Sequence, residues 1–292
     1  MTQSADLPLV FGGLEPSQSA LESSRVLIWP VPFEKTVSYG QGTREGPAAI
    51  IDASRNLELY DEEVEGEPAS IGIHTLPAID ADREPAAMML ALEREARKLL
   101  KTGKFICMLG GEHSITPPVV RAFAEIFPRL SVLQIDAHAD LRDQYDGTPH
   151  SHASAMRRVV EVCPLVQVGI RSLSSEEARA IPELPTRVFY AKDICGRADW
   201  FNHAINSLTE DVYLTIDIDG LDPSLVPSTG TPEPGGLSWN EALTLIRTLA
   251  AKRNVVGMDL VEVSGGSVTS FVAAKLIYKS LAYIFREQIP AL

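Results

Sequence analysis

The chain has 292 residues, of which 45% are hydrophobic and 22% charged, a composition typical of globular proteins. This length suits one large α/β domain or two small ones and allows a sizeable buried core. The 26 Lys and Arg residues against 39 Asp and Glu give a net charge of −13, which argues against a nucleic-acid partner and is compatible with a cationic substrate.

Three features of the sequence predict a cytoplasmic protein without a membrane span. No apolar run reaches the roughly 18 residues of a transmembrane helix. The N-terminal stretch "MTQSADLPLVFGG" lacks the basic and apolar regions of a secretory signal. The cysteines Cys107, Cys163 and Cys195 are far apart and form no C-x-x-C pair, so we expect structural thiols and neither disulfides nor a zinc knuckle.

Along the chain, short apolar runs alternate with helical patterns. Strands are predicted at 26–30, 105–110, 130–136, 165–170, 187–191, 212–219 and 255–263. Helices are predicted at 86–102, 116–127, 198–208, 238–251 and 269–285. Apolar strands that alternate with amphipathic helices indicate an α/β fold with a parallel sheet covered on both faces. No repeat or linker divides the chain, so we predict a single domain over 1–292, with 1–24 as an N-terminal extension.

Two of the predicted helices carry start signals. Thr116 precedes Pro117 and Pro118, which suits an N-cap followed by the first helical turn. Ser238 is followed three residues later by Glu241, the spacing of a capping box. Both signals support the predicted order of elements.

Potential metal ligands follow three of the predicted strands. Carboxyl ends of parallel strands meet at one edge of a sheet, and alternate strand positions point to the same side, so these ligands should converge. Buried carboxylates are costly unless cations neutralise them, and oxygen with imidazole ligands suits Mn²⁺ better than structural zinc. Each motif alone fits a turn or an acidic loop, but together they predict a two-metal site. The motifs are "GGEHS" with Glu112 and His113, "DAHAD" with Asp136, His138 and Asp140, and "DIDGLDPS" with Asp217, Asp219 and Asp222.

These motifs, with "SHAS" at 151–154, resemble in order the signature blocks of the ureohydrolase family, which includes arginases and agmatinases. "GTREGPAAI" (42–50) and "GTPEPGGLS" (230–238) resemble the agmatinase branch in particular. The resemblance implies a three-layer α/β/α sandwich with a mostly parallel central sheet. It also implies two Mn²⁺ per chain and a homo-trimer or homo-hexamer.

The resemblance further implies a role for each candidate residue. His152 would shuttle protons, with His150 as the alternative. Glu262 would receive the substrate guanidinium, Asp140 would move a proton to the leaving amine, and Thr231 would lie in the substrate loop. If the family resemblance is set aside, other interpretations are favoured for His152 and Glu262. A histidine in a polar loop is usually just solvated, and a glutamate at a strand end could pair with Lys or Arg. The implied ligands are His113, Asp136, Asp140 and Asp217 for one metal, and Asp136, His138, Asp217 and Asp219 for the other.

The expected reaction is the hydrolysis of agmatine to putrescine and urea. Arginases have Asp-Ile-Asn at the end of the "DAHxD" block, whereas this chain has Asp140-Leu141-Arg142, which argues against arginine. The stretch "VSGGSVTS" (263–270) also departs from the family, in which a proline and an aspartate are common, and it looks shortened and rich in glycine. Two interpretations stay open for it, an ordinary flexible loop or a reshaped rim of the pocket.

Several alternatives to the predicted hydrolysis of agmatine stay open. The same chemistry could act on guanidinobutyrate, guanidinopropionate, aminopropylagmatine, arginine or guanidine. The chain could also be a non-catalytic metal-binding homologue. A deacetylase on the related fold is a further class, but that branch uses a single zinc, and the full set of carboxylates argues against it.

Overall fold

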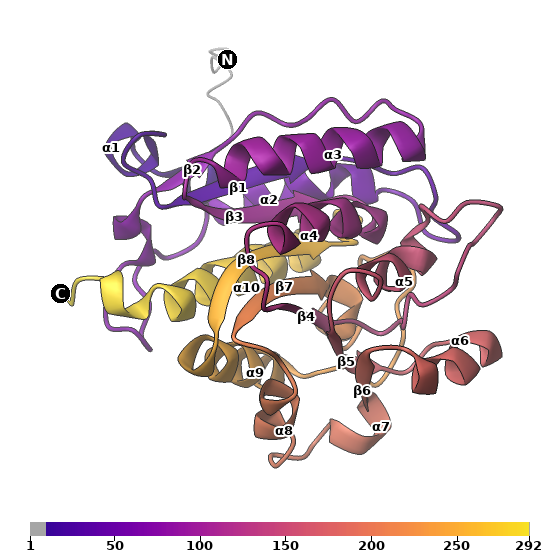
Figure 1. Cartoon of the computed structure of the whole chain (residues 1–292). Coiled ribbons are helices and arrows are strands. Elements are labelled where there is room, and N and C mark those ends of the chain that lie inside the picture. The colour runs from indigo at the N-terminus through magenta and orange to yellow at the C-terminus, as the bar shows by residue number, and fades with distance from the viewer. Residues whose placement is uncertain (1–9, 292) are drawn as a thin grey trace.

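Eight parallel strands form the centre of the computed structural model, which describes residues 10–291 (Figure 1). Their order in the sheet is β2-β1-β3-β8-β7-β4-β5-β6. All seven predicted strands are present, each within two residues of its expected bounds, and only β2, with three residues, was not predicted. The strands are β1 (Val26–Val31), β2 (Ile73–Thr75), β3 (Phe105–Gly110), β4 (Leu130–Ile135), β5 (Leu165–Ile170), β6 (Thr186–Tyr190), β7 (Asp211–Asp217) and β8 (Asn254–Val261).

Helices cover both faces of the sheet, and none of those within residues 10–291 is long and apolar enough to cross a membrane. The α-helices are α1 (Pro16–Ser19), α2 (Gly46–Ser54), α3 (Pro85–Leu100), α4 (Thr116–Ala124), α5 (Ala155–Val159), α6 (Ser175–Ala180), α7 (Ala191–Ile194), α8 (Phe201–Asn206), α9 (Trp239–Lys252) and α10 (Ser267–Ile284). Single 3₁₀ turns lie at Phe11–Gly13, Thr43–Glu45, Pro68–Ile71, His113–Ile115, His152–Ser154, Ile181–Glu183, Ile218–Gly220 and Arg286–Gln288.

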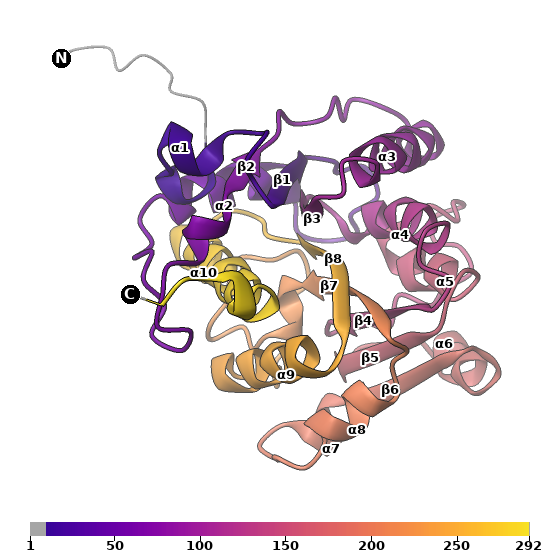
Figure 2. The same ribbon diagram turned by 60° about the vertical axis from the view of Figure 1, so that its left-hand side comes forward.

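The alternation of side chains along β1 shows how the layers form. Val26 and Ile28 belong to the same buried cluster as residues of α2, α9 and α10, whereas Leu27 and Trp29 belong to the cluster that contains residues of α3, α4 and α5. The two sets of helices lie on opposite sides of the twisted sheet (Figures 1 and 2). Successive strand residues point to opposite faces, so a strand buried on both sides must be apolar throughout. The predicted three-layer α/β/α sandwich is therefore confirmed.

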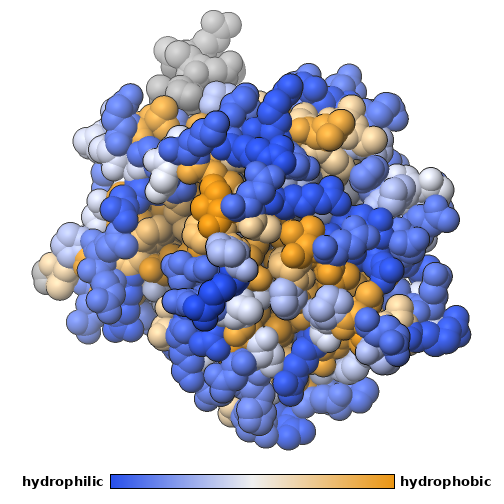
Figure 3. Space-filling model, viewed as in Figure 1, coloured by the Kyte–Doolittle hydropathy of each residue, from blue (hydrophilic) through white to orange (hydrophobic). Residues whose placement is uncertain are grey.

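The predicted N-terminal extension, 1–24, begins outside the described residues. From Val10 onward it contributes Phe11 and Leu14 to the core next to α2. Hydrophilic side chains cover most of the face seen in Figure 3, as expected for a chain with 22% charged residues.

One predicted helix start is confirmed and one is wrong. Ser238 and Glu241 form the expected capping box at the start of α9. Thr116 is not an N-cap, because the 3₁₀ turn His113–Ile115 runs directly into α4. The Thr116 hydroxyl instead donates to the buried carboxylate of Asp259, 2.9 Å away. Because the Thr116 hydroxyl is bonded to this carboxylate inside the core, it does not cap the N-terminus of α4.

Candidate active site

Four neighbouring strands at the centre of the sheet, β3, β8, β7 and β4, bring the candidate residues together at their carboxyl ends. His113 follows β3, Glu262 follows β8, Asp217 ends β7 and Asp136 follows β4. Asp217 pairs with Val261 in the sheet, so Glu262 comes one residue beyond this level. The convergence expected from the three ligand motifs thus follows from the strand order.

His113 lies at the centre of a first cluster. Its Nδ1 atom is 3.2 Å from Asp136 Oδ2, 3.2 Å from Asp140 Oδ2 and 3.5 Å from Asp217 Oδ2. All four residues are buried. One imidazole nitrogen and three carboxylates therefore face one small volume.

A second cluster shares Asp136 with the first. His138 Nδ1 lies 3.0 Å from Asp219 Oδ2 and 3.6 Å from Asp136 Oδ1. Asp136 thus presents its two oxygens to different clusters, as expected of a carboxylate that bridges two metals. The groups His113, Asp136, Asp140 and Asp136, His138, Asp219 each have the geometry to hold a metal ion.

The hydrogen bonds of His113 show that a cation fits the first cluster. Thr215 Oγ1 donates to Asp259 Oδ1 at 2.6 Å, so it can only accept from His113 Nε2–H at 2.9 Å. In the neutral ring, Nδ1 then has a lone pair that points at the three carboxylates. This buried atom has no hydrogen-bond partner among residues 10–291. A metal ion satisfies the lone pair and the carboxylates together, and the bond to Thr215 fixes the ring.

The electrostatics of the site also favour a cation. Burial, followed by repulsion from Asp219 and Asp136, raises the pKa of Asp217 well above its usual value. Burial and repulsion from Asp136 raise the pKa of Asp140. Burial, followed by repulsion from Glu112, raises the pKa of Glu262. The carboxylates are therefore too many for the two imidazoles to neutralise.

Two of the site residues adopt a backbone conformation that is rare without glycine. Asp140 has φ 52° and Glu262 has φ 65°, both in the left-handed region. Such residues typically cost about 1–3 kcal/mol and persist where the surrounding structure holds them. Glu262 is held through Oε1, which accepts the backbone N–H of His113 at 2.8 Å.

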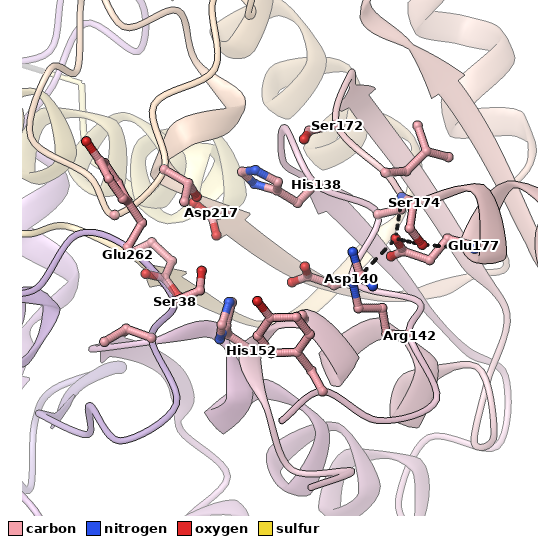
Figure 4. Close-up of a pocket in the computed structure, with 18 of the residues that line it drawn as sticks. Ser38, His138, Asp140, Arg142, His152, Ser172, Ser174, Glu177, Asp217 and Glu262 are labelled. Carbon is pink, nitrogen blue, oxygen red and sulfur yellow. Dashed lines mark hydrogen bonds and ion pairs between the residues drawn. The ribbon is translucent and has the colours of Figure 1, made fainter. Parts of the chain in front are cut away.

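A cavity of about 250 Å³ opens above the clusters. Glu262 and Asp217 lie at one end and Glu177 and Arg142 at the other, with His152 along one wall (Figure 4). Thr231 also lines the cavity, so three predicted substrate or proton-transfer positions, Thr231, His152 and Glu262, meet there. The other lining residues are Val37, Ser38, Tyr39, Gly40, His138, Ala139, Asp140, Tyr145, Ala153, Ser172, Leu173, Ser174 and Gly230.

The structure separates His150 from His152. His150 lies outside this cavity, in a narrow gap beside Arg121 and Arg158. Burial, together with the charges of Arg121 and Arg158, lowers its pKa. His152 is therefore the histidine that faces the cavity.

Two acidic residues of the ligand motifs, Glu112 and Asp222, accept hydrogen bonds from the backbone of loops and are not members of the two clusters. Glu112 accepts the backbone N–H groups of Lys35 and Thr36 at 2.6 and 2.7 Å and fixes the loop beside His152. Asp222 accepts the backbone N–H groups of Gly235 and Gly236 at 2.9 and 3.2 Å and closes the loop that contains Thr231.

The segment 263–270 does not line the cavity, which argues against the interpretation of a rim reshaped directly by this segment. Ser264 N–H donates to Ser228 O at 3.1 Å, and Gly266 has φ 74°. A Cβ on Gly266 would lie 2.2 Å from Ser228 Oγ, so the close approach requires glycine. The segment thus lies against the chain that leads to Gly230, where Val263 also pairs with Thr229, and against Gly42 and Gly46.

The chain is similar to known proteins over most of its length. The arginase family profile matches residues 24–282. The N(1)-aminopropylagmatine ureohydrolase of Synechocystis sp. is 43% identical over 270 residues, 88% of each chain. The agmatinase of Pyrococcus horikoshii is 35% identical over 271 residues, 88% of this chain and 91% of that one. The agmatine ureohydrolase structure from Thermoplasma volcanium superposes with a TM-score of 0.86 at 28% identity, covering 97% of this chain and 96% of that chain.

The fold and the site define an α/β protein with a candidate metal centre at the carboxyl edge of its sheet. The chain belongs to the arginase family. The family resemblance and the enzyme class expected from the motifs, a ureohydrolase of the agmatinase branch, are confirmed.

Proposed function

We propose that the protein hydrolyses the guanidino group of a linear guanidino amine to urea and an amine, with agmatine giving putrescine. The observation that carries this proposal is the pair of clusters sharing Asp136 beneath a cavity that ends at Glu262. A net charge of −13 suits a cationic substrate. We place the protein in the cytoplasm as a homo-trimer or homo-hexamer, as implied by the family.

The metal centre is proposed to hold two Mn²⁺ ions. The first would bind His113, Asp136, Asp140 and Asp217, and the second Asp136, His138, Asp217 and Asp219. Oxygen and imidazole ligands without thiolate support this choice of ion. When bound, divalent ions provide a strong nucleophile from water near neutral pH.

Three residues would perform the remaining steps, which are orientation of the substrate and transfer of protons. Glu262 keeps Oε1 on the backbone of His113, which leaves Oε2 to accept hydrogen bonds from the guanidinium and orient its carbon. Asp140 would take the proton of the attacking water and pass it to the amine nitrogen as the C–N bond breaks. His152, on the cavity wall, would exchange protons with solvent.

A second candidate substrate is N(1)-aminopropylagmatine, the compound for which the 43% identical relative is named. It carries the same guanidino end as agmatine and a longer amine tail. The clusters would act on both compounds in the same way. Discrimination would depend on the end of the cavity opposite Glu262, where Arg142 and Glu177 lie (Figure 4).

The test is urea release by the protein loaded with MnCl₂, measured with a panel of guanidino compounds. Agmatine, N(1)-aminopropylagmatine, arginine, guanidinobutyrate and guanidinopropionate form the panel. The highest kcat/KM for agmatine would support the first choice, and the highest for N(1)-aminopropylagmatine the second. Urea from none of them, despite bound manganese, would favour a non-catalytic metal-binding homologue.

A further inference from the structure

Arg171 occupies an unusual position directly after β5. Among residues 10–291 its guanidinium donates only to backbone carbonyls, which lie in the 3₁₀ turn Ile218–Gly220 and the residue after it, in the loop around Glu233, and in β5. The contacts run from Nη2 to Asp219 O (2.7 Å), Glu233 O (2.6 Å) and Leu221 O (3.3 Å), from Nε to Glu233 O (3.1 Å) and Pro234 O (3.1 Å), and from Nη1 to Gly169 O (3.0 Å) and Gly220 O (3.5 Å).

The backbone around Arg171 reaches a third segment of the site. The N–H groups of Arg171 and Ser172 donate to Ala137 O at 2.8 and 2.9 Å. Ala137 stands between Asp136 and His138, and His138 pairs with Ser172 in an isolated bridge. One residue and its neighbour therefore tie the segment with His138 to the segment with Asp219.

The chemistry of the guanidinium explains why arginine fits here. Carbonyls in loops without regular structure need donors, because unpaired buried backbone groups are costly. Arginine offers five N–H donors in a rigid planar fork, whereas lysine offers one nitrogen on a flexible stem. A lysine at 171 keeps the charge, but its single nitrogen cannot replace Nη2, Nε and Nη1 together, which donate to Asp219 O, Pro234 O and Gly169 O.

The contacts of Arg171 are unequal between the two clusters. Its hydrogen bonds reach the segments of His138 and Asp219, which belong to the second cluster. Within residues 10–291, none of them reaches His113 or Asp140 of the first cluster. The same side chain holds Glu233, two residues after Thr231 in the candidate substrate loop.

We propose that Arg171 is a positioning residue that sets the geometry of the second metal site and couples it to the substrate loop. This inference rests on the proposed two-metal function. Loss of the fork would let the segments around Asp219 and Glu233 separate, while the first cluster keeps its own support from Thr215 and Asp259.

The experiment titrates metal-depleted wild type, Arg171→Lys and Arg171→Met with MnCl₂ by calorimetry. We expect both variants to bind one equivalent of manganese as wild type does. Their affinity for the second equivalent should fall about 10- to 100-fold, the usual effect of losing a residue that orients a metal ligand. The electron paramagnetic resonance spectrum should change from that of a coupled Mn²⁺ pair to that of isolated ions. Hydrogen exchange should become faster at 219–221 and 231–236.

The matched control is Arg187→Lys, an exposed arginine over the ring of Phe189 on neighbouring β6, which should bind manganese as wild type does. Unchanged binding of both equivalents in Arg171→Lys would overturn the inference. An equal loss of both equivalents would also overturn it, because the contact would then support the fold at large. If Arg171→Met fails to fold, Arg171→Lys decides. Urea release is scored separately: selective metal loss without urea from wild type would refute the proposed reaction and keep the role of Arg171.

Discussion

The hydroxyl of Thr36 lies 3.3 Å from Nδ1 of His152 and also accepts the backbone N–H of His152 at 3.1 Å. Its own proton goes to Glu112 Oε1, 2.7 Å away. Glu112 is fully buried and also accepts from Ser114 Oγ at 2.6 Å, so its carboxylate has a second anchor outside the loop of Thr36. Thr36 therefore holds the proposed proton-shuttle histidine through two of its atoms.

Replacing Thr36 by valine should lower kcat for urea release about tenfold, a part of the 10²–10⁴-fold that a positioned acid–base group contributes. Valine keeps the shape but offers no hydroxyl to the ring, while KM should stay within about twofold because Thr36 is not among the residues that line the cavity. Steady-state kinetics with the best substrate of the panel would measure both. The control Thr36→Ser keeps the hydroxyl and should recover most of kcat. Wild-type kcat in Thr36→Val would contradict this support role.

The substitution Glu262→Gln tests recognition of the guanidinium. Glutamine keeps the length of the side chain but removes the charge, so kcat/KM should fall about 100-fold, equivalent to roughly 2.7 kcal/mol. Bound manganese should remain at the wild-type level, which metal analysis would check. Glu210→Gln is the control, because this glutamate is 60% exposed, pairs with Arg129 and does not line the cavity, so the variant should keep wild-type kcat/KM. A Glu262→Gln variant with unchanged kinetics would remove Glu262 from the substrate site.

The substitution Asp136→Asn tests the shared carboxylate. Both clusters use Asp136, so the variant should lose tight binding of manganese and release no urea above background. Asp143→Asn is the control: its side chain is 69% exposed and pairs with Arg158, and exposed pairs contribute little. Urea release by Asp136→Asn would show that the reaction takes place elsewhere.

Much of this site could be predicted from the sequence, because metal-ligand residue types and the ends of apolar strands are both recognisable locally. Asp136 and His138 follow an apolar strand at alternate positions, and a parallel sheet must bring such ends together. Glu262 and His152 were found through the family resemblance, since a glutamate or histidine alone has many ordinary explanations.

The supporting residues were missed for a different reason. Thr36, Thr215 and Arg171 contact site and loop residues 48 to 116 positions away, which no local pattern encodes. The sequence held one weak indication that Asp259 is a buried carboxylate, because it is a lone aspartate in the middle of the apolar run "VVGMDLVEV". Its three hydroxyl partners, which make that burial tolerable, are visible only in the fold.

Far from the site, Lys279 on α10 is buried and paired with acids of the 61–63 segment. Its Nζ lies 3.0 Å from Asp61 Oδ2 and 2.9 Å from Glu63 Oε1, and its side chain is 2% exposed. Lys279→Met would leave the fully buried Asp61 without its cation, and removal of one partner of a buried pair is strongly destabilising. The free energy of unfolding at pH 7 should fall by about 3 kcal/mol. The control Lys192→Met, whose side chain is 77% exposed, should change it by less than about 0.5 kcal/mol.

The loss caused by Lys279→Met should shrink as the pH falls. Burial alone would raise the pKa of Glu63, but hydrogen bonds from Tyr283, Lys279 and Arg247 outweigh it and lower that pKa from 4.5 to about 2. A lowered carboxyl pKa stabilises the fold above pH 4.5, and this contribution is lost as the pH falls towards 2. Without Lys279, the pKa of Glu63 should lie closer to its unfolded value, so the variant should lose less stability on acidification than wild type. Urea denaturation at pH 7, 4.5 and 3 would measure the difference, and a gap that stays constant or widens at pH 3 would refute the coupling.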